Sequence, residues 1–129
     1  MTTPFWCVLA AWVLAYAPKI ISSVAMWRQP GGYDNKMPRA QQQKLSGWGA
    51  RAHNAHLNGL ENFPPFAAAV LVAHVGGGDP RRASVLAISY VVIRTLYIAA
   101  YLADSDRLRS VLWALGFGAT GALFVLPAL

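Results

Sequence analysis

The chain has 129 residues, of which 56% are hydrophobic and 12% are charged, and its formal net charge is +6. A soluble domain usually carries about 25% charged residues, so this composition argues against a soluble protein and predicts one that is integral to a membrane. A hydrocarbon core about 30 Å thick needs roughly 20 apolar residues per helix, so residues 1–129 form a single domain with at most four or five crossings.

The first apolar run extends from about residue 4 to residue 27 and lacks both a basic start and a clear small-residue cleavage site. We therefore expect an uncleaved span and not a signal peptide. Pro18 should kink this helix, and Lys19 should either snorkel or face a cavity. The only cysteine is Cys7, so neither an intramolecular disulfide nor a cysteine-based metal site can form.

The rest of the chain alternates polar and apolar segments. Residues 28–47 combine glycines, prolines and glutamines without an apolar period, which predicts an extramembrane loop. Membrane helices tolerate prolines where neighbours satisfy the freed carbonyls, so the next span should continue through Pro64 and Pro65. The remaining spans are predicted at about residues 48–75, 81–103 and 108–128. The predicted fold is an all-α integral membrane bundle of four transmembrane helices.

Positive charge is distributed unequally among the loops. The first and third loops together carry six Lys and Arg residues, whereas the second loop offers only Arg81 and Arg82. The positive-inside rule therefore places the first and third loops in the cytoplasm, as in a multi-pass protein of a bacterial inner membrane. Basic residues between apolar segments favour membrane lipids or an anionic small molecule as partners, and no nucleic acid is expected.

The second predicted span has a polar stripe. At about 100° per residue, its polar side chains fall within one arc of about 100°. The stripe consists of Arg51, Asn54, Asn58, Glu61, Asn62 and Pro65. A charge inside a bilayer is costly, so an intramembrane ionisable group indicates a functional site with a named partner.

The third predicted span carries a matching face. Tyr90, Arg94, Tyr97 and Tyr101 are spaced i, i+4, i+7 and i+11, so a guanidinium and several phenols can present donors to one anionic ligand. Glu61 and Arg94 could instead pair with each other and hold two helices together without a ligand.

The histidines are weaker signals. His53 and His56 are spaced i, i+3, but no HExxH-type spacing accompanies them, so no metal site is expected. His56 lies about 60° from the directions of Asn54 and Glu61 and could border the polar stripe, whereas His53 points elsewhere, toward lipid headgroups or a subunit contact.

The sequence AHLNGLENFPPF at residues 55–66, preceded by Arg51, resembles the second-helix signature of the MAPEG family, the membrane-associated proteins in eicosanoid and glutathione metabolism. In that signature an arginine is followed by A-[HQ]-x-N-x-x-E and then by F-P-x-F or a variant. Arg94, Tyr97 and Tyr101 are similar to the third-helix R-x-x-[YH]-x-x-x-Y of the same family. The resemblance covers essentially the whole chain and is closest to bacterial-type members that resemble microsomal glutathione transferases.

The resemblance implies a homotrimer of four-helix protomers that binds glutathione as co-substrate between subunits, near the cytoplasmic face. It implies a glutathione transferase or peroxidase acting on a hydrophobic, lipid-like substrate. Tyr101 and Arg107 match the catalytic positions, although loop length varies and Arg109 remains an alternative for the arginine. The glutathione-binding positions implied are Arg51, His56, Asn58, Glu61, Arg94 and Tyr97.

One residue departs from the family pattern. Transferase members carry an arginine immediately before A-[HQ], where this chain has Asn54. Losing a charge-assisted contact removes about 1.5 to 3 kcal/mol of ligand affinity. A second hypothesis is therefore a non-catalytic scaffold of the same fold that binds lipids or a partner protein. A third is a small multidrug-type transporter using Glu61 as a proton-coupled carboxylate, although Arg51 and Arg94 would oppose cationic substrates.

Overall fold

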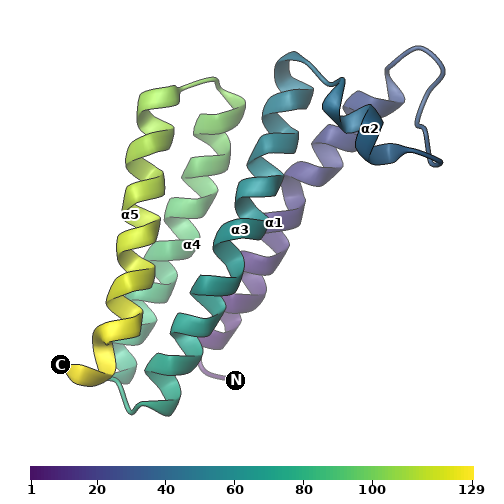
Figure 1. Cartoon of the computed structure of the whole chain (residues 1–129). Helices are drawn as coiled ribbons and strands as arrows, with labels where there is room; N and C mark the ends of the chain where they lie inside the picture. Colours follow the sequence, from purple (N-terminus) through teal and green to yellow (C-terminus); the bar gives the residue numbers. More distant parts are fainter.

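The computed structural model describes all of residues 1–129 and is entirely helical (Figure 1). Four long helices are joined by short connections, except that a short helix interrupts the first loop. The elements are α1 (Thr3–Trp27), α2 (Pro38–Gln43), α3 (Gly47–Val75), α4 (Pro80–Leu102), α5 (Asp106–Val125) and the 3-10 turn η1 (Leu126–Ala128). Both termini and the α3–α4 turn lie at one end of the bundle, and the first and third loops lie at the other (Figure 1).

The boundaries of the long helices agree with the predicted spans to within about two residues, apart from the irregular last turn at η1. Helix α1 continues without interruption through Pro18, and α3 continues through Pro64 and Pro65. The prediction of the 28–47 loop was incomplete, because it contains α2. A helix of only six residues is too short to show an apolar period in the sequence.

Small residues allow a close contact between α1 and α3. A Cβ added to Gly59 would come within 2.9 Å of the Cα of Ala15, and one added to Gly49 would come within 2.6 Å of the Cβ of Ala25. Without a side chain at these two positions, the backbones can approach closely, which is how membrane helices gain van der Waals contact.

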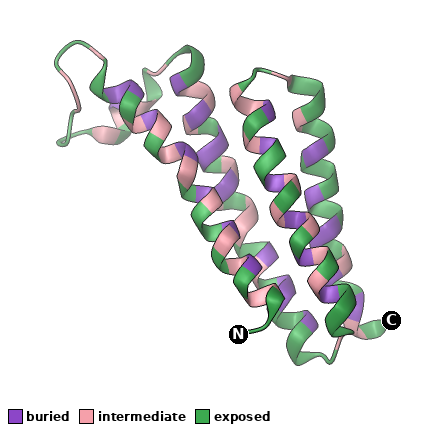
Figure 2. Ribbon diagram, turned by 180° about the vertical axis from the view of Figure 1, so that it is seen from behind, coloured by how far each residue is buried: buried purple, intermediate pink, exposed green.

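The second helix pair, α4 and α5, packs against the first through a mostly apolar core. The rings of Phe66 on α3 and Tyr90 on α4 stack with centroids 3.8 Å apart, and both side chains are buried. Cys7 lies in the same cluster as a buried free thiol. Burial is confined to the sides where helices face one another (Figure 2).

The outward surface of the bundle is apolar. Large hydrophobic side chains are exposed along the long helices, including Trp12, Val92, Leu115 and Phe117. Three helices, Thr3–Trp27, Pro80–Leu102 and Asp106–Ala128 with η1 included, are long and apolar enough to cross a membrane. Helix α3 has 29 residues and carries the polar stripe, and it is not among these three. The molecule is an integral membrane protein.

Candidate functional site

The centre of the candidate site is a hydrogen bond between α3 and α4. The Arg94 guanidinium donates from Nη2 to Oδ1 of Asn58 at 2.8 Å, and its side chain is 5% exposed. Asn62 supports this bond from one turn away, because its amide donates to both the carbonyl and Oδ1 of Asn58. The Tyr90 hydroxyl donates to the carbonyl of Asn62 at 3.2 Å. Asn58 and Asn62 of the predicted stripe therefore face Arg94 and Tyr90 of the predicted face on α4.

Aromatic rings extend the site from Arg94 toward the end of the bundle that holds the first and third loops. The Arg94 guanidinium carbon lies 4.2 Å from the centroid of the Tyr97 ring, and that ring packs edge-on against Tyr101 at 5.6 Å. Arg109, from the first turns of α5, lies over Tyr101 at 4.5 Å. We call these four residues the cation–π ladder. The two phenol rings lie in the middle and a guanidinium group lies at each end, where it is attracted to the face of the ring that it contacts.

Arg51 marks the same end of α3 and is tied to the end of α4. Its Nε donates to the carbonyl of Leu102 at 3.3 Å, and its Nη1 lies 3.6 Å from Oδ2 of Asp104. Asp104 adopts a left-handed conformation, with φ 61°, in the turn after α4. This is the only ion pair in the protomer, and Asp104 is largely exposed, so the pair is screened and contributes about 1 kcal/mol or less.

Glu61 does not pair with Arg94, so the alternative in which these two residues hold the helices together does not apply within the single protomer. Its side chain is exposed and lines a hollow of about 400 Å³ between α3 and α5. Trp113 and Phe117 form part of the opposite wall, with their rings stacked at 5.5 Å. The rotation of α3 directs Asn58 toward α4 and Glu61 toward the outside of the bundle. The polar stripe covers about 100° of the helix circumference, so its two edges face different surroundings.

His56 points to α1 and not to the polar stripe. Its Nδ1 lies 2.7 Å from the carbonyl oxygen of Ala15, so this nitrogen carries the proton and donates. The side chain is buried against Tyr16, with ring centroids 5.4 Å apart. Within the protomer the possibility that His56 borders the stripe is not realised, because its side chain packs against α1. His53 is half-buried and its Nδ1 has no hydrogen-bond partner.

The two candidate arginines after α4 have different surroundings. Arg107 is exposed, and its side chain makes no hydrogen bond or ion pair, although its backbone N–H donates to Asp106. Arg109 is half-buried on Tyr101. Asn54, at the departure from the family pattern, is exposed at the same end of α3.

Sequence reasoning missed two participants in this region. Asp104 had no period or motif to single it out, since it lies in a turn. Asn62 belonged to the predicted stripe but was not assigned a role, although its spacing of four residues from Asn58 permits the observed helix-surface contact. Arg94 is buried, whereas Arg51, Arg107 and Arg109 near the same end of the bundle are partly or fully exposed, and guanidinium groups of this kind can bind an anionic ligand.

Comparison with known proteins extends over nearly the entire chain. The family model described as the MAPEG family matches residues 3–129. Neither the curated proteins nor the solved structures contain a match to this chain.

Proposed function

The chain belongs to the MAPEG family of membrane proteins, which act in eicosanoid and glutathione metabolism, and on that premise we propose that it is a glutathione transferase or peroxidase. Its substrates would be hydrophobic electrophiles or lipid hydroperoxides dissolved in the bilayer. The observation that carries this proposal is the buried Arg94–Asn58 contact continued by the cation–π ladder. Asn58, Arg94, Tyr97 and Tyr101 are among the positions that the resemblance assigns to glutathione binding or catalysis, which supports the proposal.

The chemistry needs a cationic surface more than it needs a general base. A free thiol has a pKa near 8.5 and is mostly protonated at neutral pH, whereas the thiolate is the nucleophile. A nearby cation and hydroxyl donors favour the thiolate. We assign Arg107 and Tyr101 to this role. Arg107 is exposed and unpaired, so it is free to approach a thiol, while Arg109 is engaged with the Tyr101 ring.

The remaining polar residues can bind the carboxylate, amide and ammonium groups of glutathione. Arg51 and Arg94 supply cations for its carboxylates, and Asn58 supplies an amide. Glu61 supplies a carboxylate for its ammonium group, and Tyr97 packs against the guanidinium of Arg94. His56 faces α1 in the protomer, so a contact from this residue would come through Nε2 or across a subunit boundary.

We propose that the protein assembles as a homotrimer of four-span protomers, with α3 as the fourth span and the first and third loops in the cytoplasm. The exposed carboxylate of Glu61 supports assembly, because a lone protomer would leave it facing lipid in mid-helix. The exposed stack of Trp113 and Phe117 beside it is an apolar surface suited to a neighbouring subunit.

Purified protein in detergent tests the proposal. Glutathione at millimolar concentration should bind, and the ultraviolet absorbance of its thiolate should rise in proportion to occupied sites. Conjugation of a hydrophobic aryl halide should then follow. A correctly folded trimer that neither binds glutathione nor produces the thiolate signal would refute the assignment.

A second candidate is a non-catalytic scaffold that binds lipid or a partner protein, and Asn54 favours it. The exposed amide replaces the arginine that transferase members use for a ligand carboxylate. In a scaffold, the Arg94–Asn58 bond would serve helix packing alone. Replacing Arg107 with Ala separates the two candidates, since a scaffold has no activity or glutathione affinity to lose.

A further inference from the structure

The first loop is folded back against the end of α1. The ring of Tyr33 stacks on that of Trp27, the last residue of α1, with centroids 5.7 Å apart. Gln41 on α2 is buried, and its amide donates to the carbonyls of Met26 and Gly32. Residues 28–46, which we call the 28–46 segment, are thereby held beside the ends of α1 and α3, on the side away from α4 and α5 (Figures 1 and 2).

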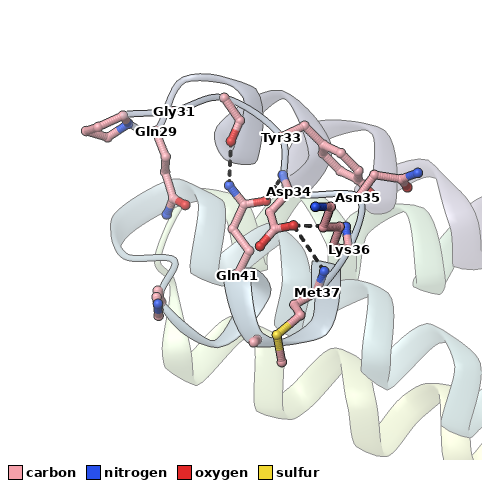
Figure 3. Close-up of a pocket in the computed structure, with 12 residues that line it drawn as sticks. Gln29, Gly31, Tyr33, Asp34, Asn35, Lys36, Met37 and Gln41 are labelled. Carbon is pink, nitrogen blue, oxygen red and sulfur yellow. Dashed lines mark hydrogen bonds between the residues drawn. The ribbon is translucent and has the colours of Figure 1, made fainter.

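A hollow of about 830 Å³ lies within this segment, between the glycine turn and α2 (Figure 3). The only acidic side chain that lines it is Asp34, whose Oδ1 accepts hydrogen bonds from the backbone N–H groups of Lys36 and Met37. The backbone N–H of Asp34 in turn donates to the Gln41 side chain at 2.9 Å. The hollow is thus shaped by internal hydrogen bonds that do not involve the lysine side chains.

The charge of the segment is strongly positive. It contains four basic residues and only one acidic residue, and the basic side chains are all exposed. Two of them, Lys36 and Lys44, line the hollow. Neither forms an ion pair, so their ammonium groups are available to an anion.

Exposed apolar side chains beside basic residues indicate that the same segment lies at the level of the membrane surface. Trp27 is 66% exposed and Met37 is 63% exposed, and the cation–π pair of Arg28 and Trp48 lies at the adjoining helix ends. Tryptophan and tyrosine at the ends of spans sit among lipid headgroups, and basic residues beside them attract anionic lipids.

From this arrangement we propose that the hollow in the 28–46 segment binds the headgroup of an anionic glycerophospholipid from the adjoining leaflet. Lys36 and Lys44 contact its phosphate, and the exposed Trp27 and Met37 lie along the upper part of its acyl chains. The site is separate from the polar face shared by α3 and α4, because it lies on the opposite side of the α1–α3 pair.

Native mass spectrometry of the detergent-solubilised protein tests this site. Phosphatidylglycerol and phosphatidylcholine with identical acyl chains are titrated separately, and we expect preferential retention of phosphatidylglycerol. Each lysine should contribute about fivefold, so Lys36→Gln combined with Lys44→Gln should lower the affinity for phosphatidylglycerol by about 25-fold. The pair Lys36→Arg and Lys44→Arg should preserve it.

The matched control is Arg81→Gln combined with Arg82→Gln, which removes two exposed charges at the opposite end of the bundle. Equal loss in the control and in the lysine variant would overturn the proposal, since it would indicate net charge and not a site. Displacement of the lipid by inorganic phosphate alone would show a free-anion site and would also overturn it. A change in oligomeric mass without a change in lipid retention would assign the surface to a second copy instead.

Discussion

Oδ1 of Asn58 accepts a hydrogen bond from Nη2 of Arg94 at 2.8 Å, and this bond joins α3 to α4 inside the bundle. Polar bonds between membrane helices are modest, at about 0.6 kcal/mol on average and up to about 2. A buried charged group that loses its partner costs more, because its desolvation is no longer compensated. The bond therefore serves both the packing of α4 and the position of the guanidinium.

Replacing Asn58 with Ala should destabilise the protein by about 1 to 3 kcal/mol and weaken glutathione binding at least tenfold. Thermal unfolding in detergent and calorimetric titration with glutathione measure the two effects. Asn54→Ala is the control for stability, since Asn54 is exposed one turn away on the same helix. Equal stability of the Asn58 and Asn54 variants would contradict the role assigned to this bond.

Replacing Gly59 with Ala should separate α1 from α3, because the new methyl group would meet the backbone of Ala15 at 2.9 Å. Overpacking of this kind costs about 1 to 3 kcal/mol, and the midpoint of thermal unfolding should fall accordingly. Gly118→Ala on α5 is the matched substitution, because nothing lies within 4 Å of its added Cβ in the protomer. If both variants unfold at the wild-type temperature, close backbone approach does not limit stability.

Arg107→Ala should lower kcat for conjugation by about 10²- to 10³-fold, the usual loss when one electrostatic stabiliser of a developing anion is removed. Arg109→Ala should have a smaller effect, of about tenfold or less, since it removes support from Tyr101 and not a contact with the thiol. Steady-state kinetics and the thiolate absorbance report the two variants. The reverse order of effects would assign the catalytic role to Arg109.

Glu61→Gln should weaken glutathione binding about tenfold, because the amide keeps the shape of the side chain but loses the charge opposite the ligand's ammonium group. Binding of a glutathione analogue without that ammonium group should be affected much less by the substitution, and this analogue provides the control. Proton-dependent efflux of a cationic drug that Glu61→Gln abolishes would instead support the transporter hypothesis.

Asn54→Arg restores the residue that transferase members carry before the A-[HQ] motif. The exposed position leaves room for the longer side chain, and a new charge-assisted contact should raise glutathione affinity tenfold or more. Asn54→Gln is the control for side-chain length without charge. An unchanged affinity in the arginine variant would indicate that this chain binds its ligand in another manner, or not at all.

Hydropathy and helical period in the sequence are sufficient to predict much of this structure. They predicted the four long helices, the continuity of α3 through Pro64 and Pro65, and the shared face of Tyr90, Arg94 and Tyr97. These properties are local, since a repeat of 3.6 residues assigns each side chain an angle about its own helix axis. The polar motifs also pointed to the correct family.

Only the tertiary structure decided which face meets which neighbour. The sequence allowed Arg94 to pair with Glu61, but the rotation of α3 presents Asn58 to it and leaves Glu61 exposed. His56 donates a hydrogen bond to the carbonyl of Ala15 on α1, because the close approach of Gly59 to Ala15 brings that carbonyl within reach. A period within one helix carries no information about the rotation of the next helix, which is set by the packing of all of them together.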